Sequence, residues 1–439
     1  MKKINVLTNQ YSNRLIACKV ASIVLAGGQG TRLFPLTLYR CKPAVTFGGR
    51  YRLIDIPLSS SLNTQIKDIF VIAQYCASSL HQHIYETYNL TDFNASKIQL
   101  ISPEESLNGK AWFKGTADAI RQNLEYFEKA PVDYFLILSG DQLYNMRFFE
   151  MLEFAVKEQA DMVIASLPVE EPEARRMGLL KVSPSSHVTD FIEKPSDPAV
   201  LKKYQLTDSF YSSHKIAPKD TPHFLGSMGI YVFKRETLFE LLKQQGDDFG
   251  KDLIPLQVKK GKTAAFVYDG YWEDIGTVSS YYKANLALTQ RKNCLDTYDD
   301  ISPIFTRAHN LPSPLIINTL IKNTIISPGS IIEADEISGS VIGIRSEIKK
   351  GTVIKDSILL GNHFYAPPLH QSPPLPKSFS IGENCVIEKA IIDENSSLGN
   401  DVHLINKNRL QKYDSDGVYI RDGIIIVTSG TSLPDGFVL

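Results

Sequence analysis

The chain of 439 residues has few cysteines, and their arrangement fits neither a disulfide framework nor a metal site. The five cysteines are scattered and odd in number, so reduced thiols are the simplest interpretation and we expect a cytoplasmic protein. His81 and His83 lie close together in the sequence, without a third metal ligand nearby. A solvated helix face is therefore the better interpretation of this histidine pair.

The sequence also lacks long apolar runs and net charge. No run approaches the roughly 18 apolar residues that span a bilayer, so no membrane partner is predicted. The 47 basic residues are balanced by 48 acidic ones, and a net charge of −1 provides no basic field to attract nucleic acid. Any phosphorylated ligand must therefore be bound by local cations.

The most informative segment is Leu25–Leu33, which reads LAGGQGTRL and overlaps the end of an apolar run over Val20–Ala26. A run of this length bounded by glycines predicts a buried strand that ends in a tight loop. Backbone N–H groups in such a loop can bind an anion, and the planar guanidinium of Arg32 suits phosphate. Lys42 places a second cation nearby in the sequence. We predict a polyphosphate site, with an ordinary glycine turn as the alternative.

The loop matches neither of two common phosphate-binding motifs. A Walker A loop requires a lysine that this segment lacks. In the dinucleotide-binding fingerprint, Leu33 stands where the third glycine belongs. A polyphosphate ligand, most simply that of a nucleotide, would therefore be bound by a different motif.

Strand-like apolar runs alternate with amphipathic, helix-like segments over the first two-thirds of the chain. The runs are Val20–Ala26, Ile69–Ala73, Tyr134–Leu138, Met162–Leu167 and Gly229–Phe233, and the amphipathic segments include Ala117–Phe127 and Phe148–Glu158. This alternation predicts an α/β domain with a parallel or mixed sheet, in which ligands bind beyond the carboxyl ends of the strands. Asp141 follows one such run, so its carboxylate is a candidate ligand-binding group, although an Asp there could also cap a helix.

Beyond about residue 300, short isoleucine and valine triplets recur at spacings near six residues, as in Thr324-Ile-Ile and Gly351-Thr-Val-Ile. That period predicts a parallel β-helix of hexapeptide coils, with an antiparallel sandwich as the alternative. The predicted division is an α/β domain over 1–290, a linker over 291–315 and a β-helix domain over 316–439. Such a solenoid commonly provides an oligomer surface.

Several sequence blocks resemble the glucose-1-phosphate adenylyltransferase (ADP-glucose pyrophosphorylase) family, in the family's order. The glycine loop and Phe191-Ile-Glu-Lys-Pro are shared by sugar nucleotidylyltransferases in general, whereas WFKGTADA from Trp112 and FGKDLIP from Phe249 resemble the ADP-glucose branch in particular. The resemblance extends from about Val20 to Val438. It implies a Rossmann-like nucleotidyltransferase domain with a mixed sheet, followed by a left-handed parallel β-helix with regulatory and oligomeric roles.

The resemblance also implies a reaction and a set of site residues. The reaction is transfer of the adenylyl group of ATP to glucose 1-phosphate, giving ADP-glucose and pyrophosphate, the committed step of glycogen- or starch-type glucan synthesis. The implied catalytic residues are Arg32, Lys42 and Asp141, and the implied Mg²⁺ ligands are Asp141 and Asp274. The nucleotide is expected at Gly27, Gly28, Gly30, Thr31, Gln74 and Gly115, and glucose 1-phosphate at Gly178, Glu193, Lys194 and Ser227.

Regulation is the part in which the sequence departs from the family. Members are typically switched by phosphorylated metabolites. Lys407 matches an effector-binding lysine of the family, and Arg40 and Arg52 remain available as further cations for such an effector. Tyr39 and Ser429, however, stand where other members have activator-binding lysines. We therefore predict weakened or altered activation, in the homotetramer that the resemblance implies.

Three other functions stay open from the sequence. The first is transfer with another nucleotide and sugar, as in a mannose-1-phosphate guanylyltransferase. The second is a non-catalytic regulatory subunit, although all the charged residues expected at the active site are present. The third is an acyltransferase or scaffold built on the solenoid, for which His403 is the lone candidate base.

Overall fold

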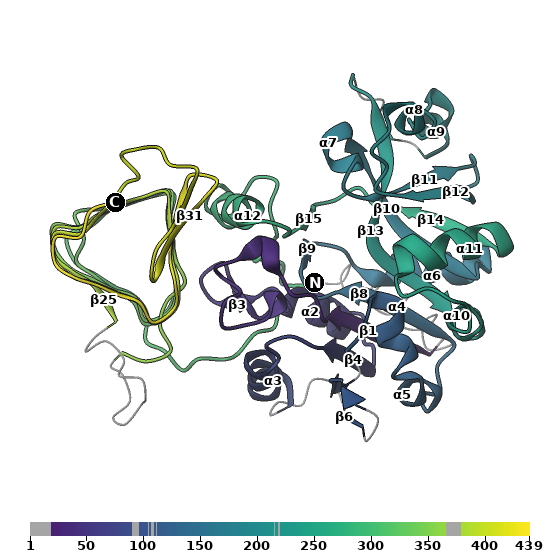
Figure 1. Cartoon of the computed structure of the whole chain (residues 1–439), viewed down its shortest axis with the longest axis horizontal. Coiled ribbons are helices and arrows are strands. Elements are labelled where there is room, and N and C mark those ends of the chain that lie inside the picture. The colour runs from purple at the N-terminus through teal and green to yellow at the C-terminus, as the bar shows by residue number, and fades with distance from the viewer. Residues whose placement is uncertain are drawn as a thin grey trace, which may run out of the picture.

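The computed structural model describes residues 19–89, 96–103, 105–106, 109–110, 112–214, 216–217, 220–365 and 379–439. An α/β domain lies beside a three-sided coil of short strands (Figure 1). The last helix of the first domain, α12, covers Val278–Gln290, and the first strand of the coil, β16, covers Leu315–Ile316. The chain between them, residues 291–314, has neither helix nor strand.

A mixed nine-stranded sheet forms the centre of the α/β domain, as predicted. Seven strands follow the order β12 (Val188–Glu193), β11 (Gly178–Val182), β13 (His223–Lys234), β8 (Tyr134–Ser139), β1 (Val20–Ala26), β4 (Asp68–Ala73) and β5 (Lys97–Ile101), while β10 (Met162–Glu170) pairs with β13 and with β14 (Thr263–Val267). Strands β8, β1, β4 and β5 are parallel, whereas β13 is antiparallel to β8, β10 and β11. Short hairpins join β2 (Thr46–Phe47) to β3 (Tyr51–Arg52) and β6 (Glu105–Ser106) to β7 (Gly109–Lys110). The strand β9 (Gln142–Tyr144) pairs with the distant β15 (Trp272–Asp274) in a separate antiparallel sheet.

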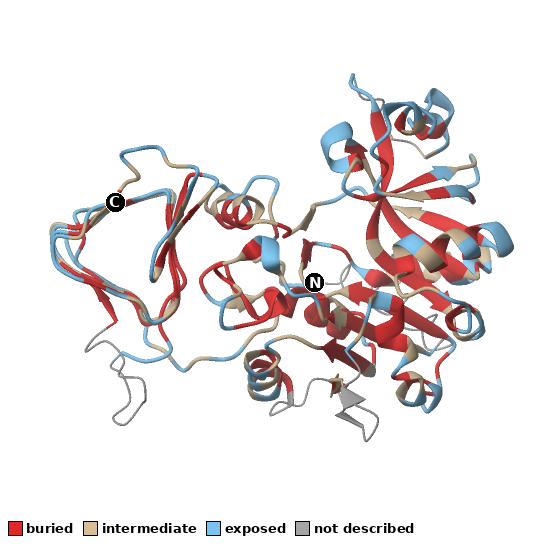
Figure 2. Cartoon of the chain, in the orientation of Figure 1, coloured by how far each residue is buried: buried red, intermediate tan, exposed pale blue. Residues whose placement is uncertain are grey.

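Helices cover both faces of this sheet, which explains why its strands are continuous apolar runs (Figure 2). On β1, Ala21 and Ile23 face one core, while Val24 and Ala26 face the other. The first core includes α4 (Thr116–Arg121), α5 (Leu124–Glu128), α10 (Arg235–Leu242) and α11 (Ile254–Lys260). The second includes α2 (Asp55–Asn63), α3 (Ser78–Ile84), α6 (Phe148–Glu158) and α12. The remaining helical segments are α7 (Glu171–Ala174), α8 (Pro198–Lys202), α9 (Asp208–His214), η1 (Thr31–Leu33), η2 (Lys42–Ala44), η3 (Tyr85–Asn89) and η4 (Phe249–Leu253).

The helix-like segment predicted over Ala117–Phe127 is interrupted. Helix α4 ends at Arg121 and α5 begins at Leu124. The side-chain amide of Asn123 donates to the Ala119 carbonyl at 2.8 Å, taking the acceptor that its own backbone N–H would use in a continuous helix.

The second domain is a coil whose strands stack into three parallel sheets (Figure 1). The first contains β16, β19 (Ile331–Ile332), β22 (Glu347–Ile348), β25 (Ser380–Ile381), β28 (Ser397–Leu398) and β33 (Ser432–Leu433). The second contains β17 (Leu320–Lys322), β20 (Glu336–Ser338), β23 (Val353–Lys355), β26 (Val386–Glu388) and β29 (His403–Leu404). The third contains β18 (Ile325–Ile326), β21 (Val341–Ile342), β24 (Ile358–Leu359), β27 (Ala390–Ile392) and β32 (Ile424–Val427), extended by β31 (Val418–Arg421) and β30 (Lys412–Asp414). Among the described residues of the coil, pairing is antiparallel only from β30 to β32, so the predicted β-helix is confirmed and the antiparallel alternative is wrong.

The third sheet of the coil packs against the α/β domain. Val341, Ile358 and Ile391 belong to the same apolar cluster as α12, and the Tyr282 hydroxyl donates to the Asp356 carbonyl at 2.5 Å. The coil is thus joined to the face of the α/β domain that carries α12.

The prediction of a solvated helix face is wrong for His83. This side chain is 7% exposed, and its Nε2 lies 2.6 Å from Oδ1 of the buried Asp55. Although burial alone would raise the pKa of Asp55, the charge of His83 holds it below the usual value. Within the described ranges, no group of three or more His, Cys, Asp or Glu could hold a metal ion, and no helix is long and apolar enough to cross a membrane.

Candidate active site

The glycine loop leaves the end of β1 in a conformation that depends on glycine. Gly30 has φ 65°, in the left-handed region, and a Cβ there would lie 2.9 Å from Cγ2 of Thr37. The Thr37 hydroxyl donates to the Gly30 carbonyl at 3.0 Å and fixes the turn. A Cβ on Gly28 would meet nothing within 4 Å, so this part of the loop faces open space.

That open space is a cavity of ≈ 530 Å³, within the range of roughly 300–1,000 Å³ that is typical of small-molecule sites. Predicted site residues from distant parts of the chain line it together, namely Gly27, Gly28, Gln74, Gly115, Asp141, Glu193 and Lys194. The carboxyl ends of β1 and β8 contribute Gly27 and Asp141, as expected for an α/β sheet.

Lys42 joins the two carboxylates predicted to hold a metal ion. Its Nζ lies 2.6 Å from Oδ2 of Asp141 and 3.8 Å from Oδ1 of Asp274. The two acids meet because Asp274 ends β15, which pairs with β9 directly after Asp141, with Asp274 opposite Gln142. The Ser139 hydroxyl donates to the other oxygen of Asp141 and orients that carboxylate.

The electrostatics of this acidic pair suit a divalent cation. Burial, reinforced by the charge of Asp141, raises the pKa of Asp274, and Lys42 and Arg32 act in the opposite direction. The two carboxylates share the Lys42 ammonium, and one or two carboxylates plus substrate phosphates are the usual protein ligands of Mg²⁺.

Arg176 is a site residue that the sequence analysis missed. A Cβ on Gly276 would lie 3.2 Å from Nη2 of Arg176 and 3.9 Å from Cζ of Arg32, so two guanidinium groups flank this glycine beside Asp274. The adjacent arginines Arg175 and Arg176 were a signal in the sequence, but only the fold shows which of them faces the acids.

Elsewhere in the lining of the cavity, Glu193 and Lys194 form an ion pair of 2.7 Å. Gly178 lies opposite Glu193 in the β11–β12 register, and a Cβ on Gly178 would lie 2.8 Å from Oε2 of that carboxylate. The sequence analysis missed Gly250, where a Cβ would also lie 2.8 Å from Oε2 of Glu193. Ser227 is 8% exposed and does not line the cavity, but its hydroxyl lies 3.5 Å from that of Tyr231, which does.

Gln74 connects two segments that line the cavity. Its side-chain oxygen accepts from the backbone N–H of Phe113 at 2.9 Å, which ties the end of β4 to the segment before Gly115. Beside it, Tyr75 and Trp112 stack with ring centroids 5.1 Å apart. The predicted contacts of Gln74 and Gly115 with adenine stay predictions.

Two family models match the chain. The Nucleotidyl transferase model matches residues 21–291, and the GLGC left-handed parallel beta-helix domain matches residues 309–438. The chain belongs to the nucleotidyl transferase family. Together the two domains are the signature architecture of glucose-1-phosphate adenylyltransferases, which confirms the resemblance seen in the sequence. Nucleotidyl transferases act on nucleotides and sugar phosphates and generally use divalent metal ions.

The three cations expected to bind an effector have different surroundings in this nucleotidyl transferase. The Arg40 side chain is only 5% exposed and is paired with Asp393 and Glu394, so it is not presented to solvent. Arg52 is more accessible but lies 3.5 Å from Glu394. Lys407 is exposed.

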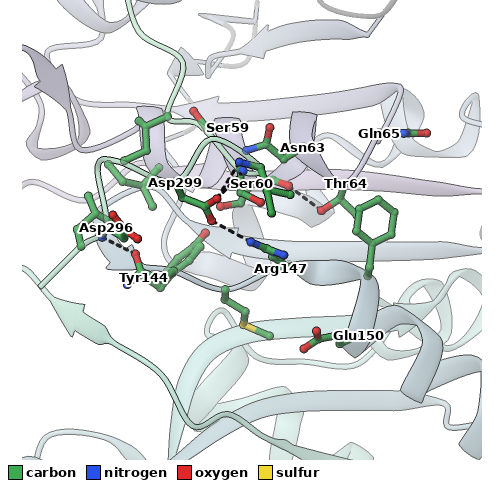
Figure 3. Close-up of a pocket in the computed structure, with 18 residues that line it drawn as sticks. Ser59, Ser60, Asn63, Thr64, Gln65, Tyr144, Arg147, Glu150, Asp296 and Asp299 are labelled. Carbon is green, nitrogen blue, oxygen red and sulfur yellow. Dashed lines mark hydrogen bonds and ion pairs between the residues drawn. The ribbon is translucent and has the colours of Figure 1, made fainter. Parts of the chain in front are cut away.

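A second cavity, of ≈ 450 Å³, contains none of the predicted site residues (Figure 3). It lies between α2, the segment from Tyr144 to Glu150 and the chain that leads to the coil. Several of its polar side chains are paired within the domain, as in the 2.9 Å contact of Arg147 with Asp299 and the 3.0 Å bond from Asn63 to the Pro303 carbonyl. We interpret it as packing space under the connecting segment.

Proposed function

We propose that this nucleotidyl transferase transfers the adenylyl group of ATP to glucose 1-phosphate, releasing pyrophosphate. The observation that supports the proposal is that residues predicted for the nucleotide and for the sugar phosphate line one cavity. Gly27, Gly28 and Asp141 line it together with Glu193 and Lys194. Lys42 links Asp141 to Asp274 beside it. A nucleotide and a sugar phosphate can thus bind side by side.

The chemistry needs positioning and charge stabilisation rather than a covalent intermediate. An oxygen of the sugar phosphate attacks the α-phosphorus of ATP, and pyrophosphate leaves from the opposite side. The loop N–H groups at Gly27–Thr31 and the Arg32 guanidinium bind the β- and γ-phosphates, which become the leaving group. Lys42 neutralises the charge that grows around the α-phosphorus.

Asp141 and Asp274 are the residues that would hold Mg²⁺, and the ion supplies charge neutralisation to the phosphates when bound. Lys194 binds the phosphate of glucose 1-phosphate, while Glu193, Gly178 and Ser227 surround the sugar hydroxyls. We further propose a cytoplasmic homotetramer that supplies ADP-glucose for glycogen-type glucan synthesis.

The test is pyrophosphate release from a panel of nucleoside triphosphates and sugar 1-phosphates with Mg²⁺. We expect ATP with glucose 1-phosphate to give the highest kcat/KM. A higher value with GTP and mannose 1-phosphate would replace the proposal with the guanylyl alternative. No release from any pair would indicate a non-catalytic subunit.

Lys194→Ala is expected to raise the KM for glucose 1-phosphate by about 10- to 100-fold, because a hydrogen bond to a charged group contributes about 1.5–3 kcal/mol. The kcat should change little, since the phosphate that Lys194 binds stays bound throughout the reaction. Steady-state kinetics with saturating ATP measure both values. Lys181→Ala, an exposed lysine of β11 outside the cavity, is the matched control. An unchanged KM with a low kcat would reassign Lys194 to the α-phosphate of ATP.

Phosphorylated metabolites are expected to activate the protein weakly. Arg40 is already neutralised by two buried carboxylates, and the positions of Tyr39 and Ser429 lack the lysines of other members. With fructose 1,6-bisphosphate or 3-phosphoglycerate, we expect stimulation below the roughly fivefold effect at the low end of allosteric coupling. Initial rates at subsaturating ATP measure it, and strong stimulation by either compound would contradict the prediction.

A further inference from the structure

A buried cluster of charges joins the two domains. Asp393 and Glu394 follow β27 of the coil, and their side chains are 2% and 8% exposed. Nη1 of Arg40, from the α/β domain, donates to Glu394 at 2.7 Å, and its Nη2 donates to Asp393. The second oxygen of Glu394 accepts from the Thr46 hydroxyl and lies 3.5 Å from Nη2 of Arg52. The carboxylates of one domain therefore satisfy the cations of the other.

The segment that receives these contacts is the one that carries Lys42. On its other side, Nη1 of Arg52 donates to the Ala44 carbonyl and the Tyr281 hydroxyl of α12 donates to the Thr46 carbonyl. The coil also binds the segment at Gly49, whose carbonyl accepts from the backbone N–H of Ile344 at 3.2 Å.

The coil also contacts the chain on the other side of Arg40. The ring of Phe34, just after the glycine loop, packs edge-to-face against Tyr419 with centroids 5.4 Å apart. The guanidinium of Arg421 lies 5.7 Å from the centroid of the same Phe34 ring. Both Tyr419 and Arg421 come from β31, so the coil holds both ends of the chain between the glycine loop and Lys42.

The connection from Arg40 to Lys42 is short and stiff. Only Cys41 separates them, and Lys42 begins the tight turn η2, in which the Ala44 N–H donates to Cys41 and the Val45 N–H donates to Lys42. A shift of the Arg40 backbone would therefore move the Lys42 ammonium away from its 2.6 Å contact with Asp141. Removing one partner of a buried ion pair leaves an uncompensated charge, which favours such a shift.

We propose that Asp393 and Glu394 are positioning residues for Lys42. Through them, the coil helps to set the geometry of the active site. The inference rests on the proposed function for the role of Lys42 in transfer. It assigns to the β-helix domain a contribution to kcat that does not require a bound effector.

The kinetic test uses the full chain with Glu394→Gln and Asp393→Asn, which keep side-chain volume and remove charge. We expect each to lower kcat by about 10- to 100-fold, the effect of a displacement near 1 Å in a reacting geometry, with KM for glucose 1-phosphate nearly unchanged. The control is Glu336→Gln. Its partly exposed carboxylate forms ion pairs with Lys322 and Lys355 of the same domain. A kcat of Glu394→Gln and Asp393→Asn equal to that of the control would overturn the proposal.

A second test separates positioning from loss of stability. In a Lys42→Ala background, Glu394→Gln should change kcat by less than about twofold, because two residues that act through one interaction are not additive. The same fold-loss in both backgrounds would show that Glu394 acts independently of Lys42 and would overturn the proposal.

A third measurement needs no turnover and keeps the inference separate from the proposed function. Hydrogen exchange of peptides covering residues 41–47 should be faster in Glu394→Gln and Asp393→Asn than in the parent, and unchanged in Glu336→Gln. Failure of the parent to transfer any nucleotide would refute the proposed function while leaving this comparison interpretable. Unchanged exchange in both interface variants would refute the positioning role even in an active enzyme.

Discussion

Asp141→Asn is expected to lower kcat by roughly 10³-fold, because metal-ion stabilisation of the transferring phosphate is worth several kcal/mol and is strongest in the transition state. Asparagine keeps the shape of the side chain and an acceptor for Ser139 but removes a charge from the pair with Asp274. The affinity for glucose 1-phosphate should be nearly unchanged, since the proposed function assigns that substrate to Lys194 and Glu193. Steady-state kinetics at several Mg²⁺ concentrations measure both effects.

The control for this substitution lies at the opposite end of the same strand. Asp133 is exposed just before β8, where its carboxylate accepts from the backbone N–H of Lys19 at 3.0 Å. Asp133→Asn should therefore leave kcat and the Mg²⁺ dependence as they are. Near-normal turnover of Asp141→Asn would remove Asp141 from the metal site, and a large rise in KM for glucose 1-phosphate would place it at the sugar phosphate instead.

The elements that the sequence predicts well are those whose burial leaves a periodic signal. The run Val20–Ala26 is strand β1, and the amphipathic segment Phe148–Glu158 is helix α6, because each buries a regular set of apolar side chains. The triplets of the coil are equally regular, as Ile325 and Ile326 of β18 illustrate. Asn123 breaks the pattern through a single side-chain hydrogen bond, which periodicity does not report.

Contacts between distant residues are what the sequence could not predict. The glycine loop, Lys42 and Asp141 could be predicted as candidates because each stands at a strand end or beside the loop, and the structure places Lys42 against Asp141. Arg176 was missed because its place beside Asp274 depends on how β15 pairs with β9. The contact of Arg40 with Asp393 also joins residues more than 300 positions apart. Because the sequence does not show this contact, Arg40 was predicted to be available to an effector.

Lys42→Ala is expected to lower kcat by about 10²–10³-fold, since a preorganised cation aimed at developing charge is worth roughly 2.7–4 kcal/mol. The substitution also removes the ammonium that the two carboxylates share, so the pKa of Asp274, already raised by burial and by Asp141, should rise further. The ionised pair needed for a divalent cation is then lost at a higher pH as the solution is acidified. The acid limb of the pH–kcat profile should therefore shift to higher pH, a change that a general loss of stability would not produce.

Lys42→Arg provides the comparison that isolates charge from geometry. It keeps the positive charge beside Asp141 and Asp274, so the acid limb should stay near that of the parent, while the longer, planar group should still lower kcat. Thermal unfolding of both variants shows whether the buried turn η2 tolerates the change. A mild effect of Lys42→Ala together with a mild effect of Arg32→Ala would refute the assignment of the glycine loop to the triphosphate. If Lys42→Ala lowered kcat strongly without shifting the acid limb, Lys42 would act on the charge of the substrate and not on the pKa of Asp274. Arg32 and Arg176 would then be the cations that stabilise the ionised carboxylate pair.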